Sequence, residues 1–162
     1  MLKLTGKAPG SAVFLGIAGA LPFVASVVIL LFVENPAVKP VLALQVYAAV
    51  ILSFLGGVRW GFAIHDKSVL SLESQSRQLL ISVLPSIVAW LAMLVPEIPS
   101  LIILALGFSA LLAVDLSSGR SGFFPAWYAQ LRIPLSVAAV SALLVGTLVL
   151  LGTGADFWPV FT

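Results

Sequence analysis

A single arginine, Arg59, interrupts a long apolar stretch in the motif SFLGGVRWG, which runs from Ser53 to Gly61. An arginine inside a membrane helix is costly unless it reaches water, a lipid headgroup or a carboxylate. Asp115 ends another apolar stretch at a similar expected depth, so it is a candidate partner. We expect an ion pair between Arg59 and Asp115. The alternatives are that Arg59 snorkels to the interface or binds a ligand.

Other polar and aromatic residues are expected at the same end of the molecule. Basic residues between membrane spans can hold anionic lipid headgroups, whereas a buried ion pair can serve only to fix helix packing. We therefore expect a cluster that either contacts a ligand or holds the helices together, made of Arg59, Trp60, Asp115, Trp127, Tyr128 and Arg132.

Residues that could support catalysis are few. His65 is the only histidine, and we interpret it as an interfacial residue at a helix end beside Asp66. Ser109, in the sequence GFSA, weakly matches a motif of intramembrane serine proteases, but a serine–histidine pair needs hydrogen-bond reach and the expected depths of the two residues disagree. With one histidine and no cysteine, a protein-built zinc site is not expected. We expect no catalytic residue, metal or cofactor, and a protein that is not an enzyme; the alternative is an enzyme that acts at the cytoplasmic interface.

Small residues recur on one side of the same motif. Ser53, Gly57 and Gly61 are spaced by four residues, and Gly56 widens their face. Small residues let helix backbones approach closely in a bilayer. We expect this face to be a helix-packing seam; the alternative is that it leaves room for a ligand.

The elements that carry these residues are membrane helices. The 162-residue chain is 61% hydrophobic and 9% charged, against about 25% charged residues in soluble domains. We expect one all-α integral-membrane domain, residues 1–162, with Pro22 and Pro85 inside helices and Pro134 in a first helical turn. A span needs about 20 apolar residues, and five stretches qualify or nearly do: 12–33, 41–64, 79–95, 100–116 and 133–151. The third and fourth are short, so four spans and a re-entrant segment are the alternative.

The basic residues are distributed unevenly between the two ends of such a bundle. With five spans, seven of the eight Lys and Arg residues lie on the N-terminal side, and only Lys39 lies on the other. The positive-inside rule then places the N-terminus in the cytoplasm and the C-terminus in the periplasm. Residues 65–78 and 117–131 are expected to be loops, and 96–99 a tight turn. The net charge of +2 is too small to indicate nucleic-acid binding.

Three motifs resemble a known family. SFLGGVRWG, LPSIVAWLA (84–92) and PAWYAQLRIPLS (125–136) are similar, in order and spacing, to the transmembrane protein 69-like family, which is domain-of-unknown-function family 3429. The family pattern often has histidine where this chain has Arg59, which weakens any family-wide catalytic role for that position. The resemblance implies a small multi-pass protein of a bacterial inner membrane and implies no activity.

From these features we expect a non-enzymatic accessory, assembly or scaffold subunit of a larger membrane complex, or one that associates with itself. The support is the small size, the short loops and the small-residue seam. The alternative is a protein that binds or transports a small anion or lipid at the cytoplasmic interface, through Arg59, Arg132 and the aromatic pair. In both cases the surroundings are the lipid bilayer.

Overall fold

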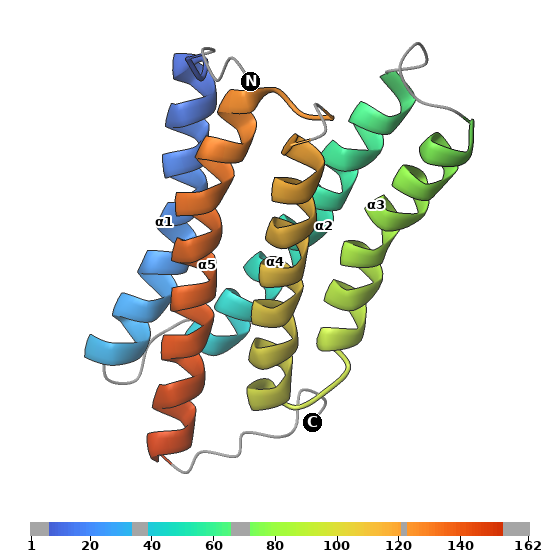
Figure 1. Cartoon of the computed structure of the whole chain (residues 1–162). Helices are drawn as coiled ribbons and strands as arrows, with labels where there is room; N and C mark the ends of the chain where they lie inside the picture. The colour runs from blue at the N-terminus through green and yellow to red at the C-terminus, as the bar shows by residue number, and fades with distance from the viewer. Residues whose placement is uncertain (1–6, 34–38, 66–71, 121–122, 154–162) are drawn as a thin grey trace.

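The described residues of the chain form five helices (Figure 1). The computed structural model describes residues 7–33, 39–65, 72–120 and 123–153. Of the residues considered above, Asp66 lies outside this part of the chain. The helices are α1 (Gly10–Phe32), α2 (Pro40–His65), α3 (Leu72–Ala92), α4 (Glu97–Arg120) and α5 (Ala126–Thr153). The all-α prediction is therefore confirmed.

Helix α2 lies at the centre of the arrangement. Helices α1, α5, α4 and α3 form a row in which each contacts the next, and α2 lies behind that row in contact with all four (Figure 1). Helix α1 is peripheral. Of the residues in its most apolar stretch, 11% are buried, against 39% in the corresponding stretch of α5. A hydrogen bond of 2.7 Å from the Tyr47 hydroxyl to the Gly19 carbonyl ties α1 to α2. The row leaves one space between α1, α2 and α5, and another between α2, α3 and α4.

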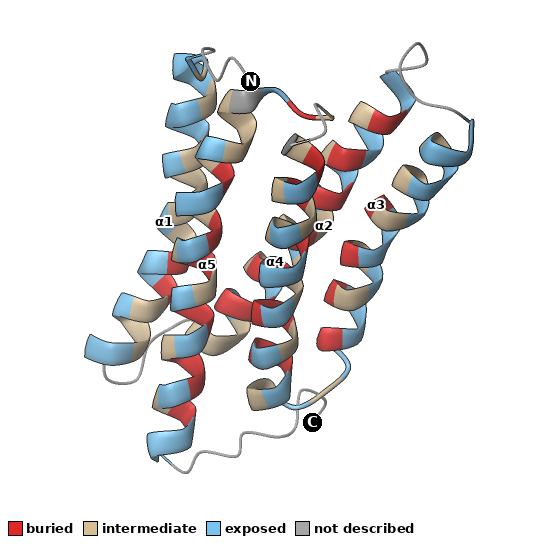
Figure 2. Ribbon diagram, in the orientation of Figure 1, coloured by how far each residue is buried: buried red, intermediate tan, exposed pale blue. Residues whose placement is uncertain are grey.

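Four of the helices are long and apolar enough to cross a membrane: α1, α2, α4 and α5. Helix α3 does not meet this criterion, because its first two turns, LESQSRQ, are polar. Its outer face is nevertheless apolar, with exposed side chains at Leu80, Leu84, Ile87 and Trp90. Figure 2 shows that exposed residues cover the outside of the row while buried residues face α2, as a lipid-surrounded bundle requires.

The helices that carry the third and fourth predicted spans begin and end at other residues than those spans. Helix α3 ends at Ala92 instead of residue 95, and it begins at Leu72, inside the expected loop 65–78. Helix α4 has 24 residues and begins at Glu97, so Pro99 lies in its first turn, where the missing N–H has no helical partner to lose. The turn between them therefore comes just before, at residues 93–96. Both helices are longer than the apolar stretches because polar residues extend them.

The fifth helix also begins earlier than expected. It starts at Ala126, so Trp127 and Tyr128 are its first residues and do not precede it. Helix α4 likewise continues to Arg120 through the serines expected to form a loop. Pro134 is therefore inside α5 and not in its first turn, whereas Pro22 and Pro85 are inside helices as predicted. A proline inside a helix leaves a carbonyl without its usual donor.

Close packing between α2 and α3 depends on Gly56. A Cβ atom at this position would collide with the carbonyl oxygen of Ser82 and meet the ring of Pro85. At Gly57 and Gly61 a Cβ would meet nothing within 4 Å. Of the four small residues predicted to form a packing seam, Gly56 is the one that contacts α3. Gly57 and Gly61 are exposed, and Ser53 is half-buried.

Candidate functional site

Three charged side chains from three helices meet inside the bundle, and we call them the charge cluster: Arg59 (α2), Asp115 (α4) and Arg132 (α5). Nη1 of Arg59 donates to Oδ1 of Asp115 at 2.9 Å, and Nε of Arg132 donates to Oδ2 at 3.1 Å. The ion pair expected between Arg59 and Asp115 is present, and Arg132 shares the same carboxylate.

The cluster is almost completely buried. Arg59 is 1% exposed, Asp115 2% and Arg132 4%. Snorkelling of Arg59 to the interface was therefore a wrong alternative. Such burial is stable only if hydrogen bonds replace the lost hydration, and both carboxylate oxygens of Asp115 are bonded. Because two arginines share one carboxylate, the cluster carries a formal charge of +1.

Further polar and aromatic groups surround Arg59. Its Nη2 donates to Oε1 of Gln78 at 2.5 Å and to Oγ of Ser118 at 2.7 Å. The guanidinium carbon lies 5.2 Å from the ring centre of Phe123 and 5.6 Å from that of Phe124. Cation–π contacts of this kind stabilise a desolvated guanidinium. Arg59 is thus contacted by α3, α4 and the segment that precedes α5.

Two hydrogen-bond donors of the charge cluster, Nε of Arg59 and Nη2 of Arg132, are buried without a partner among the described residues. A buried donor without a partner costs roughly 1–3 kcal/mol. The two unpaired donors indicate that the cluster can accept additional oxygen ligands.

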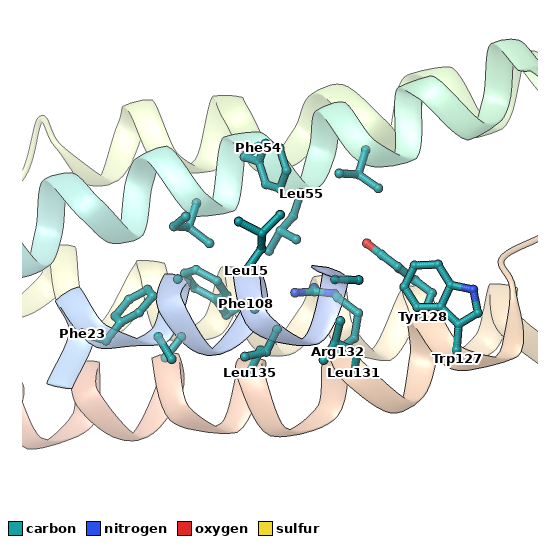
Figure 3. A pocket seen from close by; sticks show the side chains of 17 residues that line it. Leu15, Phe23, Phe54, Leu55, Phe108, Trp127, Tyr128, Leu131, Arg132 and Leu135 are labelled. Atoms are coloured by element: carbon teal, nitrogen blue, oxygen red, sulfur yellow. The ribbon is translucent and has the colours of Figure 1, made fainter. Parts of the chain in front are cut away.

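A cavity of about 300 Å³ lies between α1, α2 and α5, with Phe108 of α4 also in its lining, and we call it the apolar cavity. Its walls are almost entirely hydrocarbon and aromatic. Figure 3 shows that the hydroxyl of Tyr128 and the guanidinium of Arg132 point from α5 into this space. The labelled apolar lining consists of Leu15, Phe23, Phe54, Leu55, Phe108, Trp127, Leu131 and Leu135.

Tyr128 joins the cavity to an aromatic group at the cluster end. Its ring stacks on Phe124 with centroids 4.7 Å apart, and Phe124 packs edge-on against Phe62 of α2 at 5.0 Å. The hydroxyl makes no hydrogen bond with any described residue. The cavity therefore offers a phenol and a guanidinium at one end and only apolar surface elsewhere. This pattern, apolar walls with few placed polar groups, is typical of ligand sites.

The structure unites some of the predicted site residues and separates others. Arg132, Trp127 and Tyr128 line the apolar cavity, while Arg59 and Asp115 lie beside it. Trp60 is 44% exposed on the outer face of α2 and takes no part. Ser109 is exposed and donates to the carbonyl of Ala105. No group of three His, Asp or Glu residues suited to a metal ion occurs in the part of the chain described.

Four residues that contact Arg59 were not predicted as part of the site: Gln78, Ser118, Phe123 and Phe124. Gln78 and Ser118 were assigned to loops, and no periodicity marked them as helical. A usable signal existed, because both belong to polar extensions of apolar helices at the end that holds Arg59. Because buried polar groups are almost always hydrogen-bonded, polar side chains near a buried arginine are its expected partners.

Comparison with known proteins places the chain in a family. Its residues 8–148 match the family model described as "Protein of unknown function (DUF3429)". It is 40% identical over 153 residues to transmembrane protein 69 of Xenopus tropicalis, covering 91% of this chain and 57% of the frog protein. It is 32% identical to transmembrane protein 69 of Mus musculus over 144 residues, covering 88% of this chain and 57% of the mouse protein.

The chain thus spans a little over half the length of these curated relatives. No solved structure matches it. The resemblance seen in the three sequence motifs is therefore confirmed, and it extends over most of the chain. The chain is a multi-pass membrane protein that belongs to the DUF3429 family, and it is homologous to transmembrane protein 69.

Proposed function

We propose that this protein binds a lipid-like ligand with an anionic head, a fatty acid or an anionic lipid, in the apolar cavity. The observation that carries the proposal is the combination of apolar walls with Tyr128 and Arg132 at one end. An acyl chain would lie against Leu15, Phe54 and Leu135. The head would accept hydrogen bonds from the hydroxyl of Tyr128 and from Arg132. The role is one of binding and not of catalysis.

Charge favours an anionic head over a neutral one. The charge cluster has a formal charge of +1, since Asp115 balances only one of the two arginines. A carboxylate or phosphate beside Arg132 would bring the buried charge to zero or below. Hydrogen bonds between ionised partners are about twice as strong as neutral ones. The donor Nη2 of Arg132, which has no partner among the described residues, would then be satisfied.

A photoactivatable fatty acid tests this proposal in nanodiscs of zwitterionic lipid. Val58 lines the cavity, and Val58→Trp fills part of it. Val50, two turns earlier on the same helix, is 57% exposed and provides the control Val50→Trp. We expect adducts on α1, α2 and α5 at the cavity to fall several-fold in Val58→Trp and to be unchanged in Val50→Trp. Equal labelling in all three proteins would contradict the proposal.

We further propose that α3 is a fifth span. Helices α2 and α4 run in the same direction, so the chain must return across the bundle between them, and α3 is that return segment (Figure 1). The excess of Lys and Arg at the end that holds the charge cluster supports a cytoplasmic N-terminus and a periplasmic C-terminus, in a bacterial inner membrane. Cysteine labelling from each side of vesicles, at positions 7 and 39, tests the orientation.

A second candidate is the accessory or scaffold subunit that the sequence favoured. One observation supports it: Gly57 and Gly61 are exposed on α2 with nothing near them. Small residues spaced by four on an outward face suit contact with a partner helix. Gly57→Leu would then reduce the size of the particle obtained by mild extraction. Gly152→Leu, at an equally open glycine of α5, is the control, and equal particle sizes would contradict this candidate.

A further inference from the structure

A second hollow lies on the other side of the charge cluster, between α2, α3 and α4. Its volume is about 270 Å³, and we call it the polar hollow. It shares no lining residue with the apolar cavity. Five of its seven lining residues are polar and none is acidic: Arg59, Arg77, Gln78, Ile81, Val114, Ser117 and Ser118. The hollow is thus lined by two guanidiniums with no carboxylate between them.

The Arg59 donor without a partner belongs to the same guanidinium as a nitrogen that bonds two lining residues of this hollow. In a planar guanidinium the Nε–H and one Nη2–H lie on the same edge and form a fork that fits two oxygens of an oxyanion. Nη2 reaches Gln78 and Ser118, which both line the hollow. The Nε–H shares this edge with Nη2 and has no partner among the described residues. Gln78 supplies one acceptor where an oxyanion would supply two.

The ion pair of Arg59 with Asp115 does not use the Nε–Nη2 edge of the guanidinium. Asp115 bonds Nη1, and its second oxygen is taken by Arg132. Arg77, one residue before Gln78 on α3, is exposed and lines the hollow as a second positive charge. A ligand entering from the interface would therefore meet Arg77 first and then the Nε–Nη2 edge of Arg59.

We propose that the polar hollow is a binding site for a phosphate-type oxyanion, held between Arg59 and Arg77 after displacement of the Gln78 side chain. Arginine recognises phosphate through paired, charge-assisted hydrogen bonds. The oxyanion is either free inorganic phosphate or the phosphomonoester head of a lipid such as phosphatidic acid. This site is independent of the lipid site in the apolar cavity.

The test uses the full chain in nanodiscs and the variant Arg77→Gln, which changes an exposed side chain and leaves the buried charge cluster intact. Lys7→Gln removes an exposed positive charge at the same end of the bundle, outside the hollow, and is the control. Inorganic phosphate is titrated calorimetrically in zwitterionic nanodiscs. In a separate arm, nanodiscs that contain phosphatidic acid are analysed by native mass spectrometry.

Saturable phosphate binding that weakens about tenfold in Arg77→Gln, and not in Lys7→Gln, would support a free-anion site. Because an anionic lipid could also occupy the apolar cavity, the lipid arm uses Val58→Trp as its background. Phosphatidic acid that Val58→Trp retains, and that Val58→Trp combined with Arg77→Gln loses, would support a lipid headgroup in the polar hollow. Phosphate binding is unchanged in Val58→Trp if the two sites are separate. Neither signal in the unmodified protein, or an equal loss in Arg77→Gln and Lys7→Gln, would overturn the proposal.

Discussion

The two spaces beside α2 have similar volumes but opposite chemistry. The apolar cavity between α1, α2 and α5 has hydrocarbon walls and a phenol and a guanidinium at one end. The polar hollow between α2, α3 and α4 has arginine, glutamine and serine side chains. One carboxylate, Asp115, holds an arginine that faces each space. Where a site lies in this bundle thus depends on how the neighbouring helices surround a shared ion pair.

Helix packing also differs between the α3 side and the α1 side of α2. Helix α3 approaches α2 closely at Gly56, and its polar first turns deliver Gln78 to Arg59. Helix α1 is largely exposed, and the apolar cavity lies beside it. The close contact carries polar side chains and borders a polar hollow, whereas the looser contact carries apolar side chains and borders an apolar cavity of similar volume.

Asp115→Asn should have the largest effect, because it removes the charge shared by both sides. Loss of one partner from a buried ion pair typically costs about 3–5 kcal/mol, and here two guanidiniums lose their counter-charge. Unfolding in a titration with SDS, monitored by tryptophan fluorescence, measures the loss. Glu73→Gln, at the exposed start of α3, is the control. A loss no larger than that of the control would mean that the cluster does not hold the helices.

A charge exchange sharpens the same comparison. Arg59→Asp combined with Asp115→Arg would restore a simple isolated pair. In this protein it should restore only part of the stability, because an arginine at position 115 would face Arg132 directly. Full recovery in the double variant, measured in the same SDS titration, would show that Arg132 is not coupled to the pair.

Gly56→Ala should have a moderate effect confined to the α2–α3 side. The added methyl group would collide with the backbone at Ser82, and overpacking of this kind costs about 1–3 kcal/mol. Gly57→Ala, one residue away, meets no atom within 4 Å and should be neutral or slightly stabilising, because alanine favours the helix. The two variants are compared in one SDS series. Equal stabilities would mean that α3 does not approach α2 as described.

Tyr128→Phe should have the smallest effect. It keeps the ring stacked on Phe124 and removes only the hydroxyl at the cavity end. Binding of a fatty acid in the apolar cavity should weaken a few-fold, whereas phosphate binding in the polar hollow should not change. A competition assay against a fluorescent fatty acid measures the first effect. Weakening of both would indicate that the two sites are not independent.

The sequence predicted the helices and the central ion pair but not the two spaces. Apolar length identified the ends of α1 and α2 closely. It missed the polar first turns of α3, the polar last turn of α4 and the start of α5, and with them Gln78 and Ser118, which bond Arg59. Opposite charges at similar depth were enough to pair Arg59 with Asp115. That Arg132 shares the carboxylate depends on α5 lying beside α4, which no local pattern encodes.

The outward position of Gly57 and Gly61 was unpredictable for a related reason. A period of four residues defines a helix face but not the direction in which that face points. Gly56, one residue from that face, is the position that contacts α3. The choice follows from the rotation of α2, which is set by burial of Arg59 and of the core residues Leu52 and Leu55.

The most direct test of the account is native mass spectrometry of the protein extracted with its surrounding lipid in polymer discs. If the apolar cavity binds a lipid-like ligand, the unmodified protein and Val50→Trp retain an anionic lipid or fatty acid there when the disc is removed. Val58→Trp should retain fewer such molecules while remaining folded. Equal amounts in all three proteins, or none in any of them, would contradict binding in the apolar cavity.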